Sequence, residues 1–307
     1  MKIERFDDSK DRSLRAYSAA DEYLLHYMGD NVSSDKSIAI YHDRFGYLSC
    51  NLSYYNPQII THLKSQEKSI LANVKANSLA EPALSHPLDE LPSKVDLVLM
   101  KIPKSQDLFR LFLEHIHKNS SDEVVLHCAF MTRHFSPKLL DIASEYFEKV
   151  EQSKARKKAR ILSLSKKKDH QSSGLIKDLQ YKEESYQQYK GVFSADHIDY
   201  ASQFLLENIV LKGSEKSVLD LASGNGVFAK EISKKLPDAA FHLLDDDYLA
   251  VESAKLNIYG EKVFHYWDNS MAHWGDDTFD LIVCTPPFHF EYEVNINVCL
   301  LYTSPSP

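Results

Sequence analysis

Cysteine is scarce in this chain, and its few cysteines are far apart. The 307 residues contain four, at Cys50, Cys128, Cys284 and Cys299, and no Cys-x-x-Cys pair. Disulfide frameworks and zinc sites need closely spaced cysteines, so both classes are disfavoured. The 14 histidines include no His-Glu-x-x-His motif. We therefore expect no metal ion in the chemistry of this protein.

Long apolar runs are also lacking. No segment approaches the roughly 20 apolar residues that a membrane helix needs. The first eight residues, Met1–Asp8, are too rich in charge to form the apolar core of a secretion signal. The sequence therefore predicts a cytoplasmic protein without a membrane anchor. Its length suggests two domains, at roughly 150 residues each.

The chain has no overall excess of positive charge, because its net charge is −8. Lysine and arginine are instead concentrated in one stretch without acids, which holds Lys154, Arg156, Lys157, Lys158, Arg160, Lys166, Lys167 and Lys168. Such a run is a candidate phosphate-binding patch. A solvated linker is the alternative interpretation.

The C-terminal part predicts alternating strands and helices. Strands are expected at residues 217–221, 240–244, 262–266 and 279–284, and helices at 227–236 and 249–257. This alternation is typical of a parallel, doubly wound α/β sheet.

The N-terminal part repeats this pattern. Residues 95–103 are similar to residues 279–287, with Asp96 and Asp280 184 residues apart. Residues 38–46 parallel 218–226, and residues 74–77 parallel 254–257, both at an offset of 180. The sequence thus predicts two copies of one fold. Chance similarity between two α/β domains is the alternative.

The two copies differ where a ligand would bind. The first has Ile40 in place of Asp220, Arg44 in place of Gly224, and Lys101 in place of Thr285. A bulky cation in a tight turn blocks the close approach of a cofactor, so we expect the first copy to be non-catalytic.

A glycine-rich turn marks the expected cofactor site of the second copy. Asp220-Leu-Ala-Ser-Gly-Asn-Gly226 connects a predicted strand to a predicted helix, and Asp245 follows Gly226 by 19 residues. Gly224 and Gly226 would let the backbone approach a ligand at the helix N-terminus. The carboxylate of Asp245 would accept hydrogen bonds from ribose hydroxyls. This arrangement indicates an adenosine-type cofactor, and a purely structural turn is the alternative.

Thr285-Pro-Pro-Phe-His289 follows the last predicted strand. It resembles the (Asn/Asp/Ser)-Pro-Pro-aromatic motif of amino-methyltransferases. An exocyclic amine is a poor nucleophile, and two hydrogen-bond acceptors can direct its lone pair at a methyl donor. The prolines fix the backbone, and the aromatic ring stacks on an extruded base. Thr285, Pro286 and Phe288 are therefore the candidate catalytic residues, with a rigid loop as the alternative.

With these motifs the sequence resembles the RlmG family, the 23S ribosomal RNA guanine-N2 methyltransferases, which are related to the small-subunit RsmC group. The resemblance also rests on residues 19–25, 45–50, 101–104, 157–160 and 191–194. It implies tandem Rossmann-like (class I) methyltransferase domains, of which only the second binds S-adenosylmethionine. It implies a flipped guanine in naked or partly assembled ribosomal RNA as substrate. It also makes Lys154, Arg156, Lys157, Lys158 and Arg160 candidate RNA-binding residues.

The resemblance also assigns roles in the cofactor site. Asp220, Gly224 and Gly226 would hold the methionine end, Asp245 with Asp246 the ribose, and Asp268 would lie near the adenine amino group. The segment at residues 191–194 would lie close to cofactor or substrate.

The sequence departs from the family pattern at two positions. Ala222-Ser223 stands where the family has Gly-Cys, and Thr285 stands where it has Asn. Alanine is compatible with the turn only if the turn does not need a positive φ at that position.

We expect a degenerate domain at residues 1–165, a linker at 166–190, a catalytic domain at 191–298 and a non-native tail at 299–307. The second sheet is expected to be incomplete, with four of seven strands, so the chain as given is expected to be poorly soluble and inactive.

Other functions stay open from the sequence alone. A guanine-N2 methyltransferase of 16S ribosomal RNA, and an enzyme for a glutamine amide or a DNA adenine, would use the same motif. An inactive RNA-binding fragment is the alternative without enzyme activity.

Overall fold

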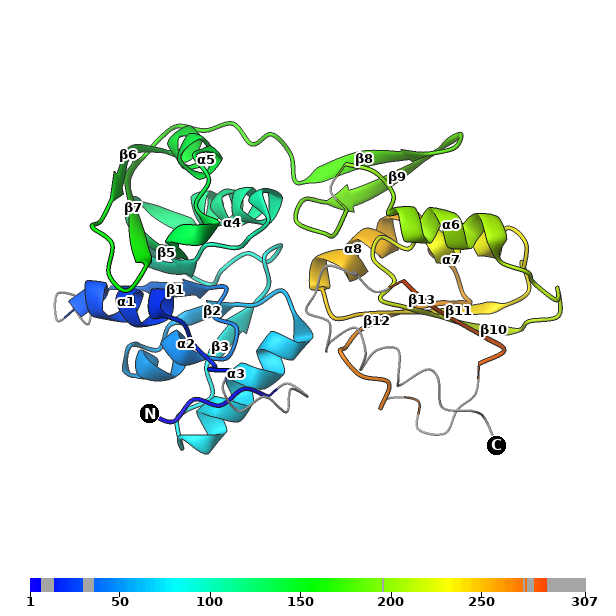
Figure 1. The fold of residues 1–307 in the computed structure, drawn as a ribbon, viewed down its shortest axis with the longest axis horizontal. Helices are drawn as coiled ribbons and strands as arrows, with labels where there is room; N and C mark the ends of the chain where they lie inside the picture. The colour runs from blue at the N-terminus through cyan, green and yellow to red at the C-terminus, as the bar shows by residue number, and fades with distance from the viewer. Residues whose placement is uncertain (7–13, 30–35, 195, 273, 275–278, 286–307) are drawn as a thin grey trace. The chain divides into compact units, whose positions relative to one another are not determined.

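The computed structural model describes the whole chain except residues 7–13, 30–35, 195, 273, 275–278 and 286–307. The chain divides into two compact units (Figure 1). Apart from the gaps just given, the first unit consists of residues 1–6 and 14–175, and the second consists of residues 176–285. Each unit is built on its own sheet.

The sheet of the first unit has seven strands in the order β3-β2-β1-β4-β5-β7-β6. Their bounds are β1 Ile38–Tyr41, β2 Gln58–Ile60, β3 Ala83–Ser85, β4 Val95–Lys101, β5 Ser120–Met131, β6 Phe147–Gln152 and β7 Ala159–Lys167. The strands are parallel except β7, which is antiparallel to both of its neighbours.

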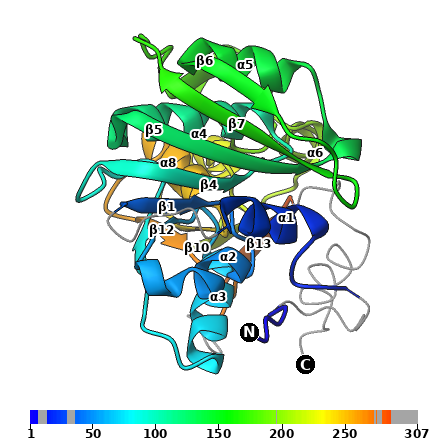
Figure 2. The same ribbon diagram turned by 90° about the vertical axis from the view of Figure 1, so that its left-hand side faces the viewer.

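Helices cover both faces of this sheet, as Figure 2 shows. They are α1 Ala19–Met28, α2 Tyr47–Asn51, α3 Lys64–Ala76, α4 Gln106–Asn119 and α5 Lys138–Tyr146, with short 3-10 turns at Ser53–Tyr55 and Thr132–His134. Successive strand residues point to opposite faces. Ile38 and Ile40 of β1 accordingly join a core with Leu24 of α1, whereas Tyr41 contacts Phe112 of α4. Burial on both faces explains why β1 is apolar throughout.

The described part of the second unit holds a parallel four-stranded sheet in the order β12-β11-β10-β13. Its strands are β10 Ser217–Leu221, β11 Ala240–Asp245, β12 Val263–Trp267 and β13 Leu281–Cys284. Its helices are α6 Tyr200–Asn208, α7 Val227–Ser233 and α8 Tyr248–Asn257. Val218 packs with α7 and α8, and its neighbour Leu219 packs on the other face near Trp274. The predicted α/β fold is confirmed.

The strand registers support a duplication. The strands β12-β11-β10-β13 of the second unit have the same order as β3-β2-β1-β4 of the first unit. The residue pairing is also the same, because Ile40 pairs with Leu99 in the first sheet and Asp220 pairs with Val283 in the second. One polar contact is also repeated. The carboxylate of Asp96 accepts a hydrogen bond from the backbone N–H of Ser37 at 3.2 Å, and Asp280 accepts the equivalent bond from Ser217 at 3.1 Å.

A buried asparagine corrects one part of the predicted alignment. The side-chain amide of Asn73 donates to the carbonyl oxygens of Phe45 and Glu4, both at 2.8 Å. Asn257 makes the equivalent bonds to Asn225 at 2.8 Å and Gln187 at 2.7 Å. Asn257 therefore corresponds to Asn73 rather than to position 77, and the offset of 180 is wrong for this helix. The second copy has four more residues between its first strand and this helix than the first copy has.

The prediction of a linker at residues 166–190 is also wrong. Strand β7 continues to Lys167, and residues 176–189 form an antiparallel hairpin of β8 Ile176–Tyr181 and β9 Glu184–Tyr189. Leu179, Tyr181 and Tyr186 alternate with polar residues and are buried in the core of the second unit. The polar composition of the segment hid this alternation. Along the chain, the boundary between the two units falls between residues 175 and 176. The expected tail lies outside the described residues.

Candidate active site

The carboxyl ends of four parallel strands lie at one edge of the second sheet. Leu221 of β10 pairs with Leu244 of β11 and with Cys284 of β13, and Asp245 pairs with Trp267 of β12. Ligands of open α/β sheets bind outside this edge. The structure thus brings the candidate residues together there, with the exception of Pro286 and Phe288, which lie outside the described residues.

The turn after β10 needs three residues with positive φ. They are Ala222 at 56°, Gly224 at 54° and Gly226 at 75°. A Cβ on Gly226 would come within 3.1 Å of the Cβ of Ala254, whereas a Cβ on Gly224 would meet no atom within 4 Å. Gly226 is therefore required for packing, and Gly224 leaves open space above the turn. The turn does need a positive φ at position 222, so the condition under which alanine would be compatible is not met and Ala222 is strained.

Asp220 is the most unusual group at this edge. Its side chain is 1% exposed, and neither carboxylate oxygen has a hydrogen-bond partner of good geometry among the described residues. Burial raises its pKa to about 7, although the backbone N–H of Ala229 partly offsets this effect. The buried hydroxyl of Ser223 also lacks a partner in the described part of the chain. Buried polar groups without partners are costly, so these two indicate a polar ligand.

Asp245 is held by the turn itself. Its two carboxylate oxygens accept hydrogen bonds from the backbone N–H groups of Gly224 and Asp247, both at 2.9 Å. Burial raises its pKa to about 6. Each oxygen keeps a lone pair, so Asp245 is oriented to accept further hydrogen bonds. Asp247, which the sequence interpretation missed, begins α8 by accepting from the backbone N–H of Leu249.

Asp246 and Asp268 flank this carboxylate. The backbone carbonyl of Asp246 accepts from the indole N–H of Trp267 at 2.7 Å. The backbone N–H of Asp268 donates to the carbonyl of Asp245 at 3.1 Å. One carboxylate oxygen of Asp268 accepts from the backbone N–H groups of Asn269 and Ser270 at 2.6 and 3.0 Å, which orders its own loop.

Thr285 follows β13 at the same edge. Its hydroxyl accepts a hydrogen bond from the buried hydroxyl of Ser202, on α6, at 3.4 Å. Ser202 was missed, because no local motif indicates a contact that spans 83 residues.

Gln188 connects the hairpin to the glycine-rich turn and was also missed. Its buried side chain accepts from the amide of Asn225 at 3.0 Å and donates toward the carbonyl oxygens of residues 192–194 at 3.2–3.4 Å. It thereby joins the segment at residues 191–194 to the turn.

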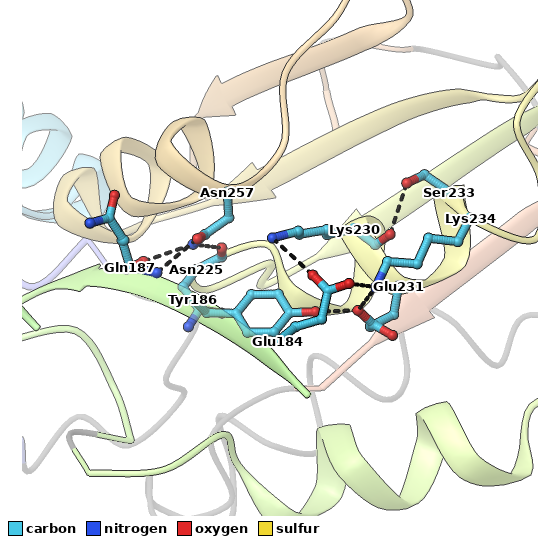
Figure 3. Close-up of polar contacts among 9 residues, drawn as sticks. All are labelled: Glu184, Tyr186, Gln187, Asn225, Lys230, Glu231, Ser233, Lys234 and Asn257. Atoms are coloured by element: carbon cyan, nitrogen blue, oxygen red, sulfur yellow. Dashed lines mark hydrogen bonds and ion pairs between the residues drawn. The ribbon is translucent and has the colours of Figure 1, made fainter. Parts of the chain in front are cut away.

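Further polar contacts fix the hairpin, as Figure 3 shows. The hydroxyl of Tyr186 donates to Glu231 of α7, and Glu184 pairs with Lys234 at 2.7 Å and Lys230 at 3.5 Å. The backbone N–H of Gln187 donates to the side chain of Asn257 in α8 at 2.8 Å.

The basic run lies in the first unit and divides into two parts. The candidate RNA-binding residues Lys154, Arg156, Lys157, Lys158 and Arg160 are exposed on and beside the turn between β6 and β7. The later lysines have structural partners. Lys166 and Lys167 pair with Glu148 at 3.9 Å and Asp122 at 3.8 Å, and Lys168 donates to the carbonyl of Ser144. Within the first part, Lys157 pairs with Glu22 at 3.1 Å and Arg160 donates to Gln152 at 3.1 Å, and the two parts differ mainly in the lower exposure of Lys167 and Lys168.

Two protein families match this chain. The family described as "RLMG N-terminal domain" matches residues 1–169, and the family described as "Methyltransferase small domain" matches residues 185–301. A relative from Shewanella sp. (strain W3-18-1), named ribosomal RNA large subunit methyltransferase G, is 30% identical over 305 residues, which cover 94% of this chain and 80% of the relative. The chain belongs to the RlmG family.

Other comparisons agree with membership of the RlmG family. A relative of the same name from Psychromonas ingrahamii is 27% identical. The matched region covers 94% of this chain and 79% of the relative. The solved 16S rRNA N2 methyltransferase RsmC of T. thermophilus, in complex with AdoMet and guanosine, has a TM-score of 0.71 at 20% identity. The matched region covers 90% of this chain and 76% of the RsmC chain. This likeness confirms the predicted class I methyltransferase fold.

Membership of the RlmG family makes the chain a methyltransferase. The described residues contain no group of three or more histidine, cysteine or acidic side chains that could hold a metal ion. None of the helices in the described ranges is long and apolar enough to cross a membrane.

Proposed function

We propose that this chain transfers a methyl group from S-adenosylmethionine to the exocyclic N2 of a guanine in the RNA of the large ribosomal subunit. The observation that carries the proposal is the buried, unpartnered carboxylate of Asp220 beside the oriented carboxylate of Asp245, in a member of the RlmG family. The names of the relatives support the large-subunit RNA, and the name of the RsmC structure supports guanine N2.

The residues present fit the cofactor. Gly224 leaves room above the turn, and Asp220 with Ser223 offers unsatisfied polar atoms to the cationic methionine end. Asp245 offers its free lone pairs to the ribose hydroxyls. Asp246 and Asp268, at the ends of the next strands, complete the proposed adenosine site. When bound, the cofactor supplies a methyl group that is already activated by a sulfonium.

The protein then has to position the amine. We assign this role to Thr285 with Pro286 and Phe288, of which only the first lies in the described residues. The hydroxyl of Thr285 can accept one hydrogen bond from the amine while it accepts another from Ser202. Catalysis here is mainly orientation of the lone pair, which needs neither a metal ion nor a strong base.

Ribosomal RNA, naked or in a partly assembled subunit, is the proposed partner. The exposed cations at Lys154, Arg156, Lys157, Lys158 and Arg160 would contact its phosphates. A cytoplasmic location, where ribosomal subunits are assembled, is part of this proposal.

The decisive test measures binding and methyl transfer separately. Calorimetry with S-adenosylhomocysteine should show that Asp245→Ala weakens binding by about 1.5–3 kcal/mol, the range for hydrogen bonds to charged groups. The matched control is Asp238→Ala, since Asp238 is an exposed acid of the same unit, paired with Lys216 at 3.6 Å. Equal affinities in the wild type and the Asp245 variant would contradict the proposed cofactor site.

Transfer is then assayed with labelled S-adenosylmethionine on deproteinised large-subunit RNA, small-subunit RNA and DNA, followed by nucleoside analysis. N2-methylguanosine in the large-subunit RNA is the product that the proposed function predicts, and its formation would contradict the sequence-based expectation that the chain as given is inactive. Label confined to small-subunit RNA would favour the 16S alternative. Cofactor and RNA binding without transfer would favour an RNA-binding protein without activity.

A further inference from the structure

The first unit contains a hollow that the proposed methyl transfer does not use. It has a volume of about 230 Å³ and is lined by Ala19, Glu22, Tyr23, Tyr47, Arg156 and Lys157. These residues come from α1, from the start of α2 and from the turn between β6 and β7. In Figure 1 this turn reaches down to α1, and the hydroxyl of Tyr23 donates to the carbonyl of Lys154 at 3.1 Å. The turn is therefore held against the helix.

The hollow lies beside the position that corresponds to the active site of the second unit. The strand registers place Lys101 where the second copy has Thr285. Lys101 contacts Asp21 of α1 at 2.9 Å, just as Thr285 contacts Ser202 of α6. Asp21 precedes Glu22 in the sequence, and Glu22 lines the hollow. The first copy thus has a hollow close to the position that corresponds to Thr285.

Aromatic rings form the walls of this hollow. Tyr47 stacks on Tyr17 with their ring centroids 4.3 Å apart and 29° between the planes. Tyr23 has the guanidinium of Arg156 6.0 Å from its ring centroid and the edge-on ring of Tyr27 on another side. Tyr23 and Tyr47 are half-buried, so part of each ring is open to a ligand. Such rings bind any nucleobase by stacking.

Positive charge lies beside the rings, on the turn between β6 and β7. Residues 154–160 contribute five cations and no acid. Glu22 neutralises one of them, since its carboxylate pairs with Lys157 at 3.1 Å. Arg156 lines the hollow as well and can contact a phosphate while its guanidinium stays near Tyr23. Aromatic walls with a cationic rim are the combination that binds single-stranded nucleic acid.

We propose that this hollow binds one unpaired nucleotide of the RNA substrate, with the base against Tyr23 and Tyr47 and the phosphate at Arg156. The inference rests on the proposed function, because it takes RNA as the substrate. It adds an RNA-binding site in the unit that lacks the catalytic residues.

A second methyl-donor cofactor fits this unit poorly. Ile40 occupies the place of Asp220, and Arg44 that of Gly224. The register also places Thr61 where Asp245 lies in the second sheet. The carboxylates that would hold methionine and ribose are therefore replaced, whereas a nucleotide needs only stacking and a cation.

The test uses a short single-stranded RNA with one 2-aminopurine, whose fluorescence is quenched by stacking. We expect wild-type protein to quench it, and Tyr47→Leu or Tyr23→Leu to lower affinity about tenfold and to remove the quenching. Tyr47→Phe should bind like the wild type, because it keeps the ring. Arg156→Gln should reduce the salt slope of binding by about one.

Tyr54→Leu is the matched control, since Tyr54 is 83% exposed in the same unit and does not line the hollow. Unchanged affinity and quenching in both tyrosine variants, or no quenching by the wild type, would overturn the inference and leave the cofactor and transfer assays untouched. Tyrosine-dependent quenching without methyl transfer to ribosomal RNA would instead refute the proposed function and keep this site.

Discussion

At the scale of single residues, Ala222 shows a cost that the protein tolerates in its glycine-rich turn. Its φ of 56° is a left-handed conformation in which a Cβ is disfavoured. We expect Ala222→Gly to raise the free energy of unfolding by about 1 kcal/mol, because relief of strain exceeds the added entropy of the unfolded chain. Chemical denaturation measures this. Ala229→Gly, inside α7, is the control and should destabilise by about 1 kcal/mol.

Asp220 makes the stability of the protein depend on pH. Burial raises its folded-state pKa to about 7 from an ordinary value of 3.8, so the folded state binds more protons than the unfolded state between these values. The free energy of unfolding should therefore fall as pH rises through this window and level off above it. Asp220→Asn should make the fall in denaturation curves less steep without abolishing it, because burial also raises the pKa values of Asp43 and Asp245 to about 6. A variant as pH-dependent as the wild type would show that other groups cause the effect.

The sequence predicted the acidic residues at this edge because each lies near or directly after the carboxyl end of a strand, where the residue pattern is local. Ser202, Gln188 and Asn257 could not be predicted in the same way. Their partners are brought close only by the folded sheet, and polar residues in helices or hairpins are usually solvated. Asp220 was predicted as a ligand-binding residue, but its complete burial could be seen only in the structure.

At the scale of elements, the hairpin β8–β9 is the largest difference from the expected organisation. Its alternation of polar and apolar side chains was present in the sequence, but polar and charged residues make up most of the two strands. The duplication was easier to predict, because β1, β4, β10 and β13 are apolar strands with recognisable ends. The four extra residues of the second copy shifted the predicted alignment of α3 and α8.

Gln188 gives the hairpin a positioning role. We expect Gln188→Leu to lower affinity for S-adenosylhomocysteine about tenfold, because Asn225 and residues 192–194 lose the side chain that joins them. Tyr186→Phe removes only the bond from the hairpin to Glu231 and should cost about 0.5–1.5 kcal/mol of stability without a change in affinity. Calorimetry and denaturation of both variants separate positioning from simple stabilisation, and equal affinities would assign Gln188 a structural role.

At the scale of the whole molecule, both units contain the same order of four parallel strands, and we propose that the two units have different tasks. The second unit retains the carboxylates and glycines of a cofactor site. The first unit has lost them and carries an exposed basic turn instead. Duplication of one fold, which the sequence predicted, would account for similar strand registers around such different side chains.

This division of tasks predicts which cations carry RNA binding. Neutralising Lys154, Lys158 and Arg160 with glutamine should reduce the salt slope of binding to ribosomal RNA by roughly two to three, since each lost phosphate contact removes roughly one unit. Affinity for S-adenosylhomocysteine should not change, because the cofactor residues belong to the other unit. The control neutralises Lys166, Lys167 and Lys168, which have partners within the first unit, and should leave the slope nearly unchanged. Equal slopes for the wild type and the first variant would show that the exposed turn is only a solvated loop.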